Sequence, residues 1–69
     1  MFWVIGYHDE DSISRLCTQD GKSCEFQTSE EACDFIRQNN ITIYENTMLI
    51  HLIGDYILDE IPAKEALAA

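Results

Sequence analysis

The chain has 69 residues, 46% of them hydrophobic, and its thirteen acidic against four basic side chains give a formal net charge of -9 at pH 7. That charge repels phosphate backbones and anionic lipid, and four scattered basic residues cannot form a cationic patch, so we expect no direct binding to nucleic acid or membrane. We expect a single acidic domain over residues 1–69 that is attracted to basic protein surfaces.

The first predicted element is a strand over residues 2–7, which are almost wholly apolar and rich in aromatic and β-branched side chains. This composition is typical of a strand covered on both faces, and therefore of an inner position in a sheet. The acidic run Asp9, Glu10 and Asp11 ends the strand, and a second strand is predicted to begin near Ile13.

The dipeptide Asp20-Gly21 predicts a β-hairpin, because both residues tolerate the positive φ of a type I′ turn. A two-residue loop at this point joins strands of about 13–19 and 22–27 and places Cys17 opposite Cys24. In this register the apolar side chains fall mainly on one face, as expected for a half-buried hairpin.

A helix is predicted over about 29–39. Thr28 is followed three residues later by Glu31, which is the spacing of a capping box, in which the carboxylate of Glu31 reaches back to the amide of the N-cap residue. Ala32 and Phe35 continue at helical spacing, and Asn39-Asn40 provides a stop signal.

Residues 47–53 form the strongest remaining strand pattern, and we expect this strand to lie beside residues 2–7. Residues 56–61 fit either an edge strand or one helical turn, and after Pro62 the Ala-rich tail over 62–69 can be helical or frayed. The fold class predicted is α+β, with a small antiparallel sheet: a β-meander of three strands, one covering helix, then one or two further strands.

No motif in the chain predicts catalysis. There is no nucleophile-elbow motif and no phosphate-binding glycine cluster, so we expect no enzyme activity and no cofactor. The cysteine and histidine spacings do not fit a zinc site, so no metal is expected. Three cysteines are an odd set and form no paired disulfide framework, so we expect a cytoplasmic protein with reduced thiols.

The acidic clusters support the first functional hypothesis, a non-catalytic inhibitor that docks on a basic nucleic-acid-binding protein and imitates nucleic acid. Its charge and length are similar, as a class only, to those of phage-encoded inhibitors such as anti-CRISPR, anti-restriction and uracil-DNA-glycosylase inhibitor proteins, and no motif carries this likeness. The predicted partner-binding residues combine acidic side chains with uncharged aromatic anchors: Asp9, Glu10, Asp11, Glu30, Glu31, Asp34, Trp3 and Tyr44.

Two other hypotheses remain open. The chain fits a small dimerisation or protein-interaction module, including a homodimer, with apolar contacts through a sheet face or residues 56–61, in which case the charge serves only solubility. It also fits a thiol sensor in which Cys17 and Cys24 pair, since directly opposed hairpin residues lie close enough for a disulfide.

Overall fold

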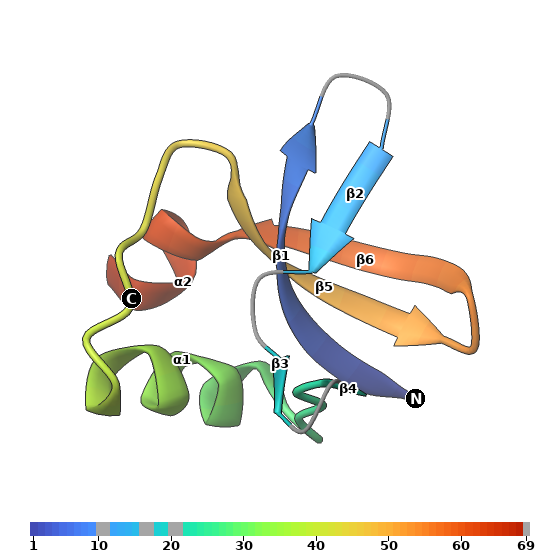
Figure 1. Ribbon diagram of the computed structural model, residues 1–69, viewed down its shortest axis with the longest axis horizontal. Helices are drawn as coiled ribbons and strands as arrows, with labels where there is room; N and C mark the ends of the chain where they lie inside the picture. The colour runs from blue at the N-terminus through green and yellow to red at the C-terminus, as the bar shows by residue number, and fades with distance from the viewer. Residues whose placement is uncertain (10–11, 16–17, 20–21, 69) are drawn as a thin grey trace.

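The computed structural model describes residues 1–9, 12–15, 18–19 and 22–68 (Figure 1). A four-stranded antiparallel sheet has the order β2-β1-β5-β6 and is accompanied by a two-stranded sheet and two helices. The elements in chain order are β1 (Phe2–Asp9), β2 (Ser12–Arg15), β3 (Thr18–Gln19), β4 (Lys22–Ser23), α1 (Ser29–Gln38), β5 (Thr47–Ile53), β6 (Tyr56–Pro62) and α2 (Ala63–Ala68). The predicted α+β class with a small antiparallel sheet is confirmed.

The two most apolar strands, β1 and β5, are the inner strands of the large sheet. They pair in register from Phe2 opposite Leu52 to Tyr7 opposite Thr47. This confirms the predicted neighbours and follows from their composition, because an inner strand buries both faces and therefore needs apolar residues at successive positions.

The β3–β4 hairpin has the predicted register, with Thr18 opposite Ser23 and Gln19 opposite Lys22. The strand predicted over 13–19 is divided, however, into β2 in the large sheet and β3 in the small one. The division arises because two different segments pair with the outer edge of β1. β2 pairs with Gly6–Asp9 of that edge, whereas Phe26 bridges Trp3 further along it through two backbone bonds of 2.7 and 2.9 Å. The predicted turn residues 20–21 and Cys17 lie outside the described residues.

Helix α1 begins and ends with the predicted caps. The hydroxyl of Thr28 accepts a 3.1 Å bond from the backbone N–H of Glu31. The Glu31 carboxylate accepts from the N–H of Gln27, one residue before the N-cap amide that the capping box predicts. At the other end Asn40 has a φ of 52°, and the N–H of Ile41 donates to the carbonyl of Ile36, which closes the helix as a Schellman motif.

Both helices lie against one face of the sheet, and the main core forms between the helices and this face (Figure 1). Ile5 and Leu49 of the inner strands are fully buried there, together with Ala32 and Ile36 of α1. Helix α2 contributes the fully buried Ala63 and packs Ala66 and Leu67 against the same core. The opposite face of the sheet carries a second buried cluster: Val4, Ile50 and Leu52.

Residues 56–61, which the sequence leaves between a strand and a helical turn, belong to the edge strand β6. A turn at Gly54 and Asp55 joins β5 to β6, and Gly54 has the positive φ of 57° that glycine adopts without strain. Within the described residues, neither helix has the length and apolar character required to cross a bilayer.

Candidate functional site

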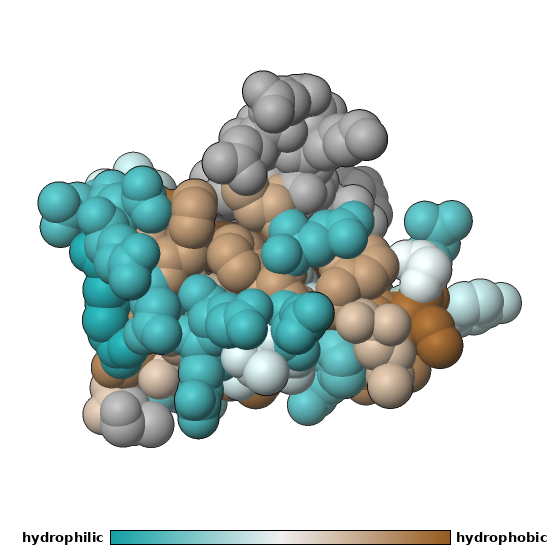
Figure 2. Space-filling view, turned by 90° about the horizontal axis from the view of Figure 1, so that it is seen from below, coloured by the Kyte–Doolittle hydropathy of each residue, from teal (hydrophilic) through white to brown (hydrophobic). Residues whose placement is uncertain are grey.

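A groove of about 720 Å³ runs between α1 and α2 and is the leading candidate for a binding site. Its lining combines carboxylates with apolar and buried groups: Ser29, Glu30, Cys33, Asp34, Arg37, Ile61, Glu65 and Ala66. Figure 2, a view of the molecule from below, shows polar side chains next to patches of hydrophobic surface. The groove therefore offers an apolar base with charged walls.

The sequence builds one wall of this groove from a single face of α1. Glu30, Cys33, Asp34 and Arg37 follow the spacing i, i+3, i+4 and i+7, which places them on one face of a helix. The Thr28 cap holds the start of this face, because it satisfies an N–H group in the turn that carries Glu30.

The other wall comes from the C-terminal end of the chain. β6 ends at Pro62, and α2 starts at the next residue. This junction places Ile61 in the base of the groove and Glu65 and Ala66 in its far wall. Ala63 is fully buried, and Ala66 packs against the main core that α1 helps to form.

Arg37 occupies one end of the groove. Its guanidinium contacts the Asp34 carboxylate at 3.5 Å and donates a 3.4 Å bond to the backbone carbonyl of Leu67 in α2. Three carboxylates and one guanidinium line the groove, which leaves two negative charges. Among the described residues, neither Glu30 nor Glu65 has an ion pair with a lysine or arginine.

Cys33 forms part of the buried base and is only 6% exposed. Burial raises the pKa of its thiol, Arg37 lowers it, and the carboxylates of Asp34 and Glu30 raise it further. The group is therefore held as a neutral thiol, which is a weak nucleophile and a small hydrophobic side chain.

The structure brings two of the predicted acidic residues, Glu30 and Asp34, into the groove. Glu31 is exposed beside them, but its carboxylate serves the helix cap. Glu10 and Asp11 lie outside the described residues, and so does the side chain of Asp9. Sequence reasoning missed Glu65, because a tail expected to be helical or frayed gives no position for its side chains.

The two predicted aromatic anchors differ in exposure. Trp3 is half-buried, packs against the main core and stacks on the ring of His51 with a centroid separation of 4.4 Å. Tyr44 is 61% exposed and lines a second hollow of about 430 Å³ with Tyr7, Asn46 and Thr47. Of the two, only Tyr44 meets the condition of exposure that a free anchor requires.

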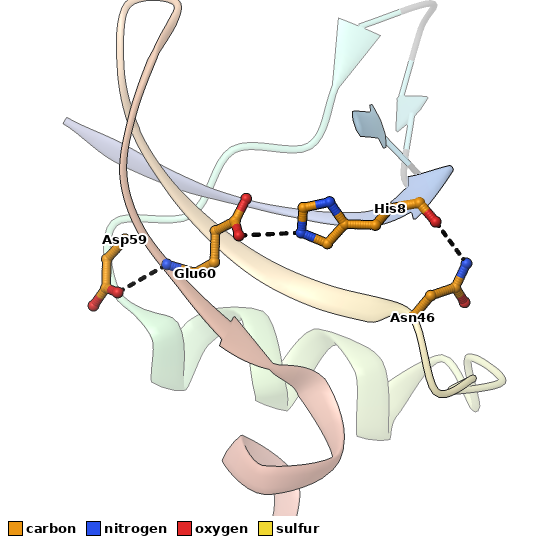
Figure 3. A network of polar contacts seen from close by, with 4 residues as sticks. All are labelled: His8, Asn46, Asp59 and Glu60. Carbon is orange, nitrogen blue, oxygen red and sulfur yellow. Dashed lines mark hydrogen bonds and ion pairs between the residues drawn. The ribbon is translucent and has the colours of Figure 1, made fainter. Parts of the chain in front are cut away.

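A polar contact links the first and last strands of the chain across β5. Figure 3 shows His8 of β1 and Glu60 of β6 pointing toward one another, with the ring Nε2 3.1 Å from a Glu60 carboxylate oxygen. The backbone carbonyl of His8 accepts a 2.9 Å bond from the amide of Asn46. The exposed Lys64 and Glu45 pair at 2.6 Å, and this lysine lowers the pKa of the Glu45 carboxyl. These contacts tie the loop before β5 to the surrounding elements.

The cysteines are in different states. Cys33 is a free cysteine, whereas Cys24 is disulfide-bonded, so the expectation of reduced thiols is wrong for Cys24. Its predicted partner Cys17 lies outside the described residues. Within the part of the chain that the structure describes, no three histidine, cysteine or acidic side chains come together as metal ligands would.

Comparison of the chain with protein-family models, with curated proteins and with solved structures finds no match.

Proposed function

We propose that this protein is a non-catalytic binding protein that docks on a basic surface of a nucleic-acid-binding protein and excludes the nucleic acid. The α1–α2 groove would receive a lysine or arginine side chain of that partner. The observation that carries the proposal is the lining of the groove, in which Glu30, Asp34 and Glu65 surround the apolar base made by Cys33, Ile61 and Ala66.

Such a lining is complementary to a long cationic side chain. The aliphatic stem of lysine or arginine covers apolar surface while its charged head reaches a carboxylate. Arg37 gives an internal example, because its guanidinium contacts Asp34 and the carbonyl of Leu67 at one end of the same groove. A partner's cation would make equivalent contacts with Glu30 and Glu65.

The overall charge supports the same partner class. A net charge of -9 steers a cationic surface toward this molecule from a distance and keeps nucleic acid away. We also propose a cytoplasmic location, because an odd set of cysteines that includes the free Cys33 is not the paired framework of a small secreted domain.

The test is partner capture with matched charge variants. The double variant Glu30→Lys/Glu65→Lys reverses two groove charges, whereas Glu25→Lys reverses one exposed carboxylate outside the groove lining. A partner captured at low salt should be retained by the wild type and by Glu25→Lys, lost with the groove variant, and released by added nucleic acid. We expect the groove variant to slow association about tenfold at low salt.

Retention of the partner by the groove variant, or the same loss with Glu25→Lys, would contradict the proposal. Glu31→Lys is a poor test, because its carboxylate accepts from the N–H of Gln27 and its loss weakens the helix start. Asp34→Lys is equally ambiguous, since it leaves Arg37 without its carboxylate partner.

A dimerisation or interaction module with apolar contacts is the second candidate. The observation that favours it is the exposure of Tyr56, Ile57 and Leu58 on the edge strand. In that case binding changes little with salt and with the groove charges.

A thiol sensor is the third candidate, favoured by the disulfide bond of Cys24. In a reducing compartment a disulfide is usually transient, catalytic or redox-sensing. If this function is correct, mild peroxide should convert two thiols to a disulfide reversibly and change partner capture. Capture that is independent of oxidation would exclude it.

A further inference from the structure

The tip of the β5–β6 hairpin carries a group of exposed apolar side chains outside the groove. Ile53 is 47% exposed, Tyr56 79%, Ile57 45% and Leu58 49%. We call these four residues the hairpin tip. The hairpin projects from the body of the molecule at the end opposite α2 (Figure 1), and Figure 2 shows hydrophobic surface at that end. An apolar cluster of this kind on a small acidic protein is typical of an interaction site.

Part of the hairpin tip continues the sheet face on which the helices lie. Ile53 pairs with Tyr56, and Leu49 pairs with Ile61, so that these four side chains share one face of the sheet. α1 and α2 bury Leu49 and partly cover Ile61, but they leave Ile53 and Tyr56 exposed. The Ile53–Tyr56 pair of the hairpin tip and the apolar base of the groove therefore lie on one face of the sheet, with the pair His51–Asp59 between them, whereas Ile57 pairs with Leu52 of the cluster on the opposite face.

The backbone of β6 is poorly suited to accept another strand. The backbone N–H and C=O of Trp3 bond Phe26 on the outer edge of β1. The backbone groups of the next residue, Val4, therefore point the other way, toward β5. Ile50 lies opposite Val4, so its backbone N–H and C=O point toward β1. Glu60 lies opposite Ile50 on the other side, so its backbone N–H points away from the sheet.

That outward N–H of Glu60 is already used, because it donates a 2.8 Å bond to the side chain of Asp59 (Figure 3). The next outward position is Pro62, which has no N–H. The pairing of β5 with β6 also shifts register between His51 and Leu52. A bulge, an acidic pair and a proline are the devices that protect an edge strand from strand addition. A partner would thus contact side chains of the hairpin tip, not the β6 backbone.

Charge identifies the class of partner. Asp55, Asp59 and Glu60 belong to the same turn and strand as the hairpin tip. A second copy would bring the same carboxylates and another net charge of -9 to the contact, which opposes self-association. A segment that alternates basic and apolar side chains satisfies both the carboxylates and the apolar surface.

The groove and the hairpin tip are close enough for one such segment. Five residue steps of β6 separate Tyr56 from Ile61 in the base of the groove, and at the rise of a β-strand this is about 17 Å. A standard protein interface, which buries about 800 Å² on each partner, covers a distance of this order.

We propose that the hairpin tip is the apolar anchor for an amphipathic basic segment of the same partner whose cationic side chain enters the groove, an inference that rests on the proposed function. The groove supplies attraction that depends on salt, and the hairpin tip supplies contact area that does not. Tyr56, as the most exposed aromatic side chain of the hairpin tip, is its central residue.

The experiment uses two synthetic peptides with the same number and spacing of lysines. One carries leucine at the intervening positions, and the other carries serine. Binding to the full chain is measured by fluorescence anisotropy over a range of salt. Tyr56→Ser/Leu58→Ser alters the hairpin tip and Glu30→Lys/Glu65→Lys alters the groove, while Tyr44→Ser tests the competing anchor, because Tyr44 is an exposed tyrosine outside both regions.

We expect the leucine peptide to bind the wild type about tenfold more tightly than the serine peptide, and Tyr56→Ser/Leu58→Ser to remove that difference without changing the salt dependence. Equal binding of the two peptides, or the same loss with Tyr44→Ser, would overturn the inference. So would a dimer in sedimentation that dissociates in the Tyr56→Ser/Leu58→Ser variant, because a second copy would then be the occupant.

Different results would contradict the proposed function and the inference about the hairpin tip. If the groove variant binds both peptides like the wild type and salt has no effect, the groove is not the cationic site, whereas preference for the leucine peptide would still report on the hairpin tip. If the groove variant weakens both peptides but the hairpin-tip variant weakens neither, the groove stands alone and the inference about the hairpin tip is wrong.

Discussion

The α1–α2 groove and the Ile53–Tyr56 pair of the β5–β6 hairpin tip lie on the same sheet face but expose different groups. In the groove the helices cover part of the face, so that its apolar side chains Ile61 and Ala66 are half-buried and carboxylates line its walls. At the hairpin tip no helix covers the face, and the apolar side chains themselves are exposed. Charges act over a Debye length, about 8 Å in physiological salt, whereas apolar surface acts only on contact. The groove charges therefore attract a partner from a distance, and the apolar side chains of the hairpin tip add affinity once the partner is in contact.

The largest expected effect is on the free energy of unfolding, and it separates the buried part of the sheet beneath the helices from its exposed end at the hairpin tip. Leu49→Ala removes a fully buried side chain beneath α1 and should lower the free energy of unfolding by about 3 kcal/mol. Ile57→Ala, in the partner strand but half-exposed, should change it by less than about 0.5 kcal/mol. Chemical denaturation of both variants measures the difference. Similar losses would mean that the hairpin tip is packed as part of the core.

A second pair of variants perturbs each region alone. Thr28→Ala removes the cap of α1 and should cost about 1 kcal/mol, with Thr28→Ser as the control that keeps the hydroxyl. Hydrogen exchange should rise in the first turn of α1, where Glu30 lies, and stay unchanged in β5 and β6. Faster exchange across the whole chain would show that the groove and the hairpin unfold as one unit.

Gly54→Ala is the corresponding change in the hairpin. At a φ of 57° an alanine is strained, although no atom lies within 4 Å of the added Cβ, so the cost should be about 1 kcal/mol of backbone strain. Gly54→Asn is the control, since asparagine tolerates this conformation better. Exchange should increase around residues 53–57 while α1 keeps its protection. A larger effect in α1 would contradict the separation of the two regions.

A smaller effect concerns pH and the groove alone. The raised pKa of Cys33 means that the folded state holds the thiol proton more tightly than the unfolded state does. The thiol therefore contributes to the free energy of unfolding below its ordinary pKa of about 8.5. This contribution is lost as the pH rises through the higher pKa of the folded state. The wild type should therefore lose more stability than Cys33→Ala under alkaline conditions, as followed by denaturation at several pH values. Parallel curves for the two proteins would show that Cys33 does not titrate differently on folding.

Local patterns in the sequence predicted the parts of the fold that depend on neighbouring residues. The Asp20-Gly21 dipeptide predicted the pairing of Thr18 with Ser23, and Thr28 and Asn40 marked the ends of α1. The apolar composition of residues 2–7 and 47–53 was sufficient to make them inner neighbours. Each of these features is decided by turn chemistry, capping or burial of a whole strand.

The candidate site was less predictable, because it depends on how distant segments meet. Glu30 and Asp34 could be named from the helix, but Glu65 joins them only because α2 packs against α1 after Pro62. The sequence named residues 56–61 as one candidate for an apolar contact, but it did not predict the exposure of the hairpin tip. Tyr56, Ile57 and Leu58 resemble a buried strand in composition, and their exposure follows from an edge position beyond the reach of the helices.

The most direct test of the account is to map the contact surface of the leucine-bearing basic peptide by NMR. We predict that backbone amide shifts change at Cys33, Ile61 and Ala66 in the groove and at residues 53–58 of the hairpin, while residues 41–46, which belong to neither region, keep theirs. Shift changes spread evenly over the acidic surface, or concentrated around Tyr44, would contradict the claim that one partner occupies both the groove and the hairpin tip.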